Sequence, residues 1–241
     1  MQLHVKGYTF FLTDRVDEEG NVKIMFLSLQ KQPYPCVLIE LNKNKRKTEG
    51  YLQSVNFYTS CSIKEKELEK QSGTITMIQT ALTYMLNQYP HIKKVQLQDE
   101  TFIDIPTKPL ITPRRLLKGQ LGWYEEYLGA YPLLDILKEK LKYLRKPETQ
   151  AKLQTLLPSN SSDNKWWIPT NIIPIAEQLQ ERLFHYLIGT MWVISASTIR
   201  NYNIEYIMEP VSSQKAGSYQ KRMKQIFAKR PKETLSRQRY L

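Results

Sequence analysis

Residues 72–99 read SGTITMIQTALTYMLNQYPHIKKVQLQD, and two different periodicities follow one another in these residues. Its apolar residues first recur every three or four positions, which predicts an amphipathic helix over residues 73–89. The proline that follows ends this helix. Valine and leucine then alternate with polar residues, which predicts a strand over residues 92–98.

The residues before this helix predict an antiparallel meander. Two β-rich runs, 8–13 and 22–27, flank a turn that contains glycine and three acidic residues. A third apolar run covers residues 36–41, and residues 50–58 alternate between two faces. The last of these strands, the helix and the strand after it form a strand–helix–strand unit, which normally makes a right-handed crossover.

The residues after this unit predict mostly helices. Three prolines make residues 104–114 a loop, and a helix follows over residues 114–128, ended by Gly129. A second helix is predicted from Pro132 to near Pro147, with leucines in line.

Residues 158–164 are the most linker-like stretch of the chain, because they hold proline, serine, asparagine and aspartate. A helix is predicted over residues 174–188, and strands over 191–194 and 204–208. The overall prediction is an α/β fold with a mixed sheet and flanking helices, followed by a mainly helical C-terminal region and a basic tail. The predicted units are 1–131, a helical connection 132–157, the linker 158–164, a helical and strand unit 165–209, and the tail 210–241.

The chain has 241 residues, of which 41% are hydrophobic, so it is long enough to bury a core. This composition excludes wholesale disorder and a collagen-like or disulfide-stapled scaffold. We find no apolar run of membrane-spanning length and no signal-peptide pattern, so we expect an intracellular protein. Cys36 and Cys61 are expected to be reduced, buried thiols. Scattered histidines and only two cysteines give no reason to expect a metal site.

The formal net charge is +12, and the excess of Lys and Arg over Asp and Glu is unevenly distributed along the sequence. One basic run covers residues 42–47, and residues 211–241 hold nine Lys and Arg against Glu233 alone. Such clusters attract nucleic acid or an acidic partner protein, although a solvated loop and a frayed tail are the plainer interpretation. The candidate binding residues of the tail are Lys221, Arg222, Lys224, Lys229, Arg230, Arg237 and Arg239.

Two motifs resemble those of the GNAT-type N-acetyltransferases, and the resemblance covers residues 20–131. The first motif is the run Lys70-Gln71-Ser72-Gly73-Thr74-Ile75, and the second is the run from Trp123 to Ala130. In that family a glycine-containing turn and the following helix start hold the pyrophosphate of acetyl-CoA. The sequence is similar above all to divergent GNAT-like proteins of large cytoplasmic DNA viruses. This resemblance implies that the protein is located in a viral factory in the host cytoplasm, with the virion as a second location.

The resemblance implies a set of site residues. Lys70, Ser72, Gly73 and Thr74 would hold the cofactor, and Tyr124 would protonate the departing thiolate. A carboxylate at the strand end, Asp99 or its neighbour Glu100, would deprotonate the amine substrate.

The sequence departs from the family at two places. Ile75 stands where the family has a small residue, and Tyr124 lies five residues before Gly129 where four is usual. The plainer readings are a helix cap at Ser72, an aromatic anchor at Tyr124 and a turn carboxylate at Asp99.

Three functions therefore stay open, and so does the oligomeric state. The first is an N-acetyltransferase. The second is a non-enzymatic protein of the virion or viral factory, with the basic tail bound to nucleic acid or to another viral protein. The third is a sequence-independent nucleic-acid binder in which residues 211–241 carry most of the affinity. Arg114, Arg115 and Lys118 are either contacts for an anionic substrate or a solvated helix face.

Overall fold

The computed structural model describes seven stretches of the chain. They are residues 1–27, 35–42, 48–55, 72–98, 111–163, 166–179 and 191–210. The predicted site residues Lys70 and Asp99, the basic run and the basic tail lie outside them.

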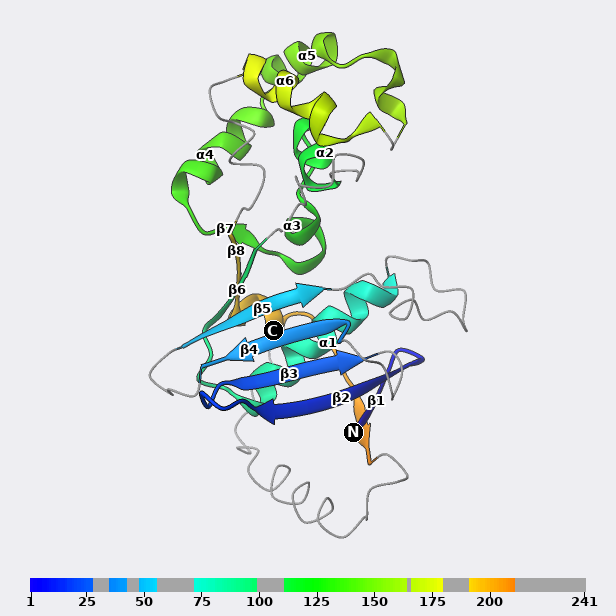
Figure 1. Ribbon diagram of the computed structural model, residues 1–241, viewed down its shortest axis with the longest axis vertical. Helices are drawn as coiled ribbons and strands as arrows, with labels where there is room; N and C mark the ends of the chain where they lie inside the picture. Colours follow the sequence, from blue (N-terminus) through cyan, green and yellow to red (C-terminus); the bar gives the residue numbers. More distant parts are fainter. Residues whose placement is uncertain are drawn as a thin grey trace, which may run out of the picture.

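A mixed sheet runs through the molecule (Figure 1). In the described residues it has nine strands in the order β7-β8-β6-β5-β4-β3-β2-β1-β9. Among these nine described strands, β5 and β6 are the one pair that is parallel. The strands are β1 (Gln2–Val5), β2 (Tyr8–Val16), β3 (Val22–Leu27), β4 (Val37–Leu41), β5 (Glu49–Val55), β6 (Lys94–Gln98), β7 (Tyr131–Pro132), β8 (Met191–Ser195) and β9 (Ile207–Glu209).

The predicted meander is confirmed as β2 to β5, each strand antiparallel to the next. Strand β1, which the sequence did not predict, extends it at the N-terminal side through a tight turn at Lys6 and Gly7, both with positive φ. The alternation of β3 and β4 places Ile24, Phe26 and Ile39 in the core. One face of the meander is therefore apolar and buried, as alternating strands require.

Helix α1 (Ser72–Gln88) covers this apolar face, and the strand–helix–strand prediction is confirmed. Its apolar stripe includes Ile78, Leu82 and Met85, which are fully buried. The helix and β4 approach β5 closely at Gly50, where an added Cβ would lie 2.8 Å from Leu41 Cδ2 and 3.4 Å from Met85 Sδ. A side chain at this position would require the Leu41 side chain to move.

The predicted helix 114–128 is two helices, α2 (Ile111–Leu117) and α3 (Trp123–Leu128). The chain turns between them at Gly119, whose φ of 69° favours glycine. Gly129 ends α3 as predicted, in the left-handed conformation with φ 60°.

The remaining helices lie with α2 and α3 at one end of the sheet (Figure 1). They are α4 (Asp135–Leu144), α5 (Pro147–Leu156), the 3-10 turn η2 (Ser159–Ser162) and α6 (Pro169–Leu179). We call α2 to α6 the helical lobe. The helix predicted from Pro132 starts at Asp135 because Pro132 pairs with Trp192 as part of β7. Helix α6 starts before its predicted first residue, Pro174, which lies inside it.

The predicted linker does not separate a second unit from the sheet. Strand β8 lies between β6 and β7, and β9 pairs with β1, so the sheet includes strands from both sides of residues 158–164. The linker stretch itself packs onto the helical lobe, because the buried Trp167 donates its Nε1–H to the carbonyl oxygen of Ser161 at 2.9 Å.

Helix α8 (Ala196–Arg200) follows β8 and packs against α1. The Ser195 hydroxyl caps it by accepting from the Thr198 backbone N–H at 3.0 Å. Just beyond α8, Tyr202 donates its hydroxyl to the carbonyl oxygen of Leu128 at 2.7 Å, which ties this part of the chain to the end of α3.

Cys36 is buried just before β4 and is disulfide-bonded. The expectation of a reduced thiol is therefore wrong for this residue. The other cysteine, Cys61, lies outside the described residues.

Candidate functional site

The carboxyl ends of β5 and β6 form the first part of the candidate site. Their parallel register runs from Glu49 opposite Lys94 to Leu52 opposite Leu97 and stops there. Strand β5 continues to Val55 and β6 to Gln98, and on its other side each strand keeps its antiparallel partner, β4 and β8. Parallel strands that part at their carboxyl ends leave backbone groups and space where ligands commonly bind.

The start of α1 is the second part, and here the structure places Ser72, Gly73 and Thr74. Ser72 is the first residue of the helix, Gly73 is buried and Thr74 is half-buried. The first turn of this 17-residue helix contains no acidic residue. Its N–H groups and the positive end of the helix dipole therefore meet no carboxylate from that turn, an arrangement that suits an anion.

Helix α3, which carries Tyr124, is the third part. The Gln79 side-chain amide of α1 donates to the carbonyl oxygen of Tyr127 at 3.0 Å, which joins α3 to the second turn of α1. The Tyr124 ring packs between Trp123 and Trp192, at centroid distances of 5.3 and 6.4 Å. This packing agrees with the aromatic-anchor interpretation and also places Tyr124 beside the sheet.

Trp192 contacts the Tyr124 ring and also lies beside the carboxyl end of β6. It pairs with Leu97, so it shares the face of the last β5–β6 pair. Its indole is fully buried, and its Nε1–H has no hydrogen-bond partner in the described part of the chain. The sequence did not single out this residue, because a tryptophan in an apolar strand looks like ordinary core.

Two ion pairs fix α3 between its neighbours. Arg115 of α2 pairs with Glu126 and also donates to the carbonyl oxygen of Leu121 at 2.8 Å. Arg145, at the end of α4, donates to Glu125 Oε2 at 2.6 Å, and the Glu125 carboxylate also accepts from the Gly122 N–H at 2.8 Å. Sequence reasoning missed these pairs because no local spacing signals them.

The three basic residues of α2 that the sequence singled out do not lie on one surface of the structure. Arg115 points to α3 and is paired there, whereas Arg114 and Lys118 lie over the indole of Trp167. These two cations therefore belong to a different surface from Arg115.

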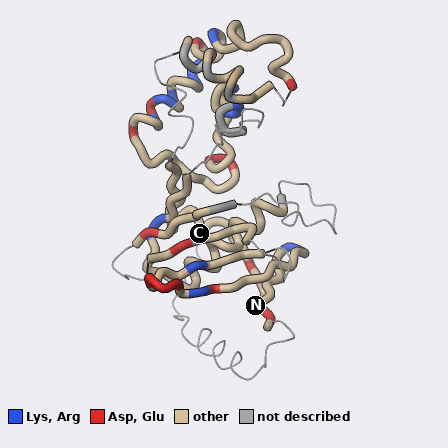
Figure 2. Tube along the Cα trace, viewed as in Figure 1, with Lys and Arg blue, Asp and Glu red and all other residues tan. Residues whose placement is uncertain are grey.

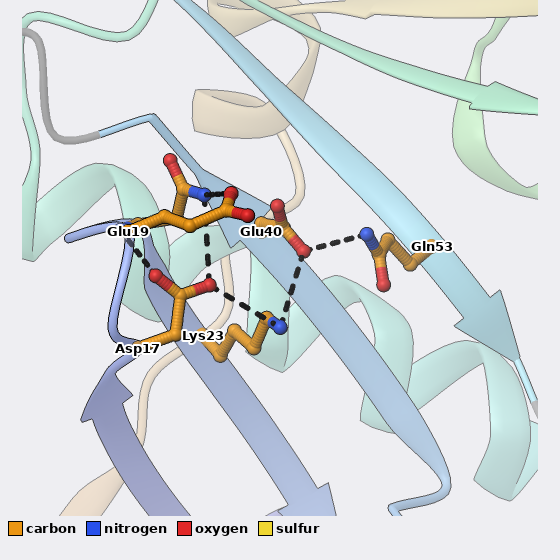
Figure 3. Close-up of polar contacts among 6 residues, drawn as sticks. Asp17, Glu19, Lys23, Glu40 and Gln53 are labelled. Atoms are coloured by element: carbon orange, nitrogen blue, oxygen red, sulfur yellow. Dashed lines mark hydrogen bonds and ion pairs between the residues drawn. The ribbon is translucent and has the colours of Figure 1, made fainter.

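A network of charged and amide side chains covers the outer face near the β2–β3 turn (Figure 3). Lys23 Nζ lies 3.3 Å from Asp17 Oδ2 and 3.9 Å from Glu40 Oε2, and the Gln53 amide donates to Glu40 at 2.6 Å. Burial raises the pKa of Asp17, but hydrogen bonds from Asn21 and Lys23 outweigh it and lower that pKa overall. Asp17 and Glu40 share the single cation Lys23, and no group of acidic, His or Cys side chains in the described residues is arranged to hold a metal ion.

Basic and acidic residues both occur along the described part of the chain (Figure 2). Its Lys and Arg residues equal its Asp and Glu residues in number, so the entire excess of +12 belongs to the other segments. Among them are the tail cations named above. Any strong electrostatic attraction of a polyanion therefore depends chiefly on those segments.

Within the described stretches, no helix combines the length and the hydropathy that a bilayer crossing requires. Comparison of the chain with protein-family models, with curated proteins and with solved structures finds no match to any of them.

Proposed function

We propose that the chain is a GNAT-like protein that binds acetyl-CoA and transfers its acetyl group to an amine. One observation supports the proposal: β5 and β6 pair in parallel, and α1, whose start follows the carboxyl end of β5 along the chain, lies between them in the sequence. A strand that leads into a glycine-containing helix start is the feature by which that family holds the cofactor pyrophosphate.

The proposed cofactor contacts are the first-turn backbone N–H groups of α1, together with Ser72, Thr74 and the cation of Lys70. Gly73, the second residue of the helix, leaves room for phosphate oxygens to approach the backbone. Ile75, which stands where a small residue is usual, is half-buried. Since the fold covers part of its surface, it crowds the helix start less than a fully exposed side chain would.

The proposed reaction needs two proton transfers. The amine nitrogen attacks the thioester carbonyl carbon, the new C–N bond forms and the C–S bond breaks. The amine proton goes to a carboxylate, for which Asp99 is the candidate, and the Tyr124 hydroxyl donates a proton to the thiolate of coenzyme A. The position of α3, bonded to α1 through Gln79, supports this role for Tyr124.

A thermal-shift titration with acetyl-CoA, with adenosine diphosphate as the control ligand, tests the binding step. At 100 times its dissociation constant, the cofactor should stabilise the fold by about 2.7 kcal/mol. Gly73→Asp should abolish the shift, because its carboxylate repels phosphate at the helix start. Thr74→Glu should do the same without altering a buried position, and Gln154→Asp, which adds the same charge on exposed α5, should not. Absence of a shift with millimolar acetyl-CoA would contradict the proposal.

A second candidate function is binding of nucleic acid or of an acidic viral protein through the basic tail. The observation that favours it is the balanced charge of the described residues, which leaves the excess to segments such as residues 211–241. Fluorescence anisotropy with a labelled oligonucleotide should show affinity that falls steeply with salt and is lost when the tail is deleted. Binding that survives the deletion, or that ignores salt, would contradict this candidate.

A further inference from the structure

Large apolar side chains lie exposed where β7 ends and α4 begins. They are Tyr131, Leu133, Leu134 and Ile136, which are between 37% and 56% exposed. We call these four residues the β7–α4 patch. The Lys138 ammonium nitrogen of α4 lies 5.7 Å from the centroid of the Tyr131 ring, so the first turns of the helix and the strand form one surface. Exposed apolar residues are ordinarily scattered singly, and a contiguous group marks a contact with another molecule.

Leu134 departs from the usual chemistry of a helix start. It is the N-cap residue of α4, with φ −93° and ψ 132°, and its apolar side chain makes no capping hydrogen bond. Serine, threonine, asparagine and aspartate are preferred at this position because their side chains accept a bond from a first-turn N–H. Leu134 is also the most exposed residue of the patch, so burial in the core does not explain it. Such a departure from a local rule is typical of a functional surface.

The patch lies at one edge of the described sheet. Strand β7 is at the end of the strand order, beside β8, and its second residue is Pro132. A proline has no backbone N–H, so this edge is poorly suited to pairing with a further strand. Helix α4, which follows β7, lies at the periphery of the helical lobe in Figure 1. The contact that the patch offers is therefore made by side chains and not by a backbone ladder.

Two acid–base pairs lie beside the patch on α4. Lys138 donates to Asp135 and Lys142 donates to Glu139, both at 2.8 Å. The half-buried Lys140 is the remaining charged residue of this helix. A rim of mixed sign gives little attraction to a strongly acidic or strongly basic partner. It suits a second copy of itself, because a two-fold axis can bring the carboxylates of one copy to the ammonium groups of the other.

We propose that the β7–α4 patch is the surface through which the chain binds a second copy of itself about a two-fold axis. In such an interface the same surface of both copies takes part, so the apolar patch of one copy covers that of the other. The interface then has an apolar centre inside a polar rim, as protein interfaces commonly do. The proposal does not depend on acetyl-CoA binding, because no residue of the patch belongs to the proposed cofactor site.

Sedimentation velocity of the full chain over a range of concentrations measures the association. High salt and treatment with nuclease exclude contacts made through polyanions bound to the basic tail. As the concentration rises, the 28.5 kDa monomer should give way to a dimer of twice that mass. A chain that stays monomeric at every concentration would overturn the proposal.

The variant Leu134→Ser separates association from folding. Serine is a good N-cap, so at a concentration where both chains are monomeric the variant should melt no lower than the native chain. Its dimer dissociation constant should rise by about tenfold or more, because the apolar contact is lost from both copies. Ile136→Glu should act in the same direction, since an acidic residue suits the first turn of a helix but not an apolar interface.

Ile207→Ser is the matched control, because it removes an exposed isoleucine from β9 at the opposite edge of the described sheet. It should leave the dissociation constant unchanged. A dimer that Ile207→Ser dissociates, or that Leu134→Ser and Ile136→Glu leave intact, would reject the patch as the interface. A monomeric native chain that Leu134→Ser destabilises would show that another segment of the chain covers the patch. A monomeric native chain whose stability is unaffected would assign the patch to a different protein, and both results reject the proposal.

Discussion

At the residue scale, single hydrogen bonds join parts of the chain that lie far apart in sequence. The Tyr202 hydroxyl, which donates to the Leu128 carbonyl oxygen, is the clearest case. Burial raises the pKa of Tyr202, so the phenol stays protonated and remains a donor over the whole physiological range. The bond satisfies the carbonyl oxygen of Leu128, the last residue of α3, which has no partner within the helix.

Tyr202→Phe should lower the free energy of unfolding by about 1 kcal/mol, because it removes the donor and leaves a backbone acceptor unsatisfied. Urea unfolding followed by circular dichroism measures the change. Tyr143→Phe is the matched control, since no hydrogen bond of the Tyr143 hydroxyl is recorded in the described residues. Equal stability of the two variants would show that the Tyr202 bond does not stabilise the fold.

Asp17 gives a prediction about pH. Its pKa is lowered in the folded chain from the ordinary 3.8, so its contribution to stability is present above pH 4 and is lost as the pH falls through the folded value. Asp17→Asn should therefore be less stable than the native chain at neutral pH, with a difference that shrinks as the pH approaches 2. Thermal melts across this range measure it, and a difference independent of pH would contradict the assignment.

Local rules predicted some of these residues and not others. Gly129 was predicted as the end of a helix, because a left-handed residue after a helix is usually glycine, and its φ confirms this. By contrast, nothing local distinguishes Arg114 from Arg115, although one lies on Trp167 and the other pairs with Glu126. Their partners lie in α3 and just before α6, and only the tertiary fold brings these segments close to α2.

At the scale of elements, the position of α3 is the most consequential feature, because it carries Tyr124. The Arg115–Glu126 and Arg145–Glu125 pairs hold this six-residue helix from α2 and α4. So short a helix is not stable alone, and its position depends on such tertiary contacts.

Glu125→Gln should destabilise the fold by about 1–3 kcal/mol, because it weakens charge-assisted hydrogen bonds from Arg145 and Gly122 in a site where the Glu125 side chain is only 13% exposed. Glu139→Gln, which breaks an exposed pair with Lys142 on α4, should change stability by less than about 0.5 kcal/mol. Chemical unfolding of both variants measures the contrast. Similar losses in the two would mean that the Glu125 pair is no more than a surface contact.

Periodicity predicted the elements that bury a single face against the core. The meander, α1 and β6 have one buried face each, and they form close to where the sequence placed them. The helix expected from Pro132 failed at its first residues, because Tyr131 and Pro132 pair with β8. That pairing depends on a strand about sixty residues later in the chain, which a local pattern does not contain.

At the scale of the whole molecule, the sheet requires β8 and β9, which come last in the chain among the described strands. Strand β8 is the partner of both β6 and β7, and β9 closes the other edge on β1. The sequence could not predict this order, because equally apolar strands compete for the same edge until the chain has folded. The candidate site has the same origin, since α1, α3 and β8 meet only in the assembled sheet.

A chain cut at the predicted linker, residues 1–163, should fail to fold cooperatively, because β6 and β7 would lose their shared partner. A chain that ends at residue 210 keeps all the described strands and should unfold in one transition. Near-ultraviolet circular dichroism and thermal melts distinguish these outcomes. A well-folded 1–163 fragment would show that the N-terminal region is a unit of its own.

The position of β8 in the sequence also determines when β6 gains its partner strand during translation. When Gln98 leaves the ribosome, the open edge of β6 is ready to pair, but its partner begins only at Met191. At about 5–20 residues per second, translation of the intervening helices leaves that edge unprotected for on the order of ten seconds. During this interval a nascent chain can pair with its neighbour on the same message, so expression at low temperature with an added chaperone should favour soluble protein.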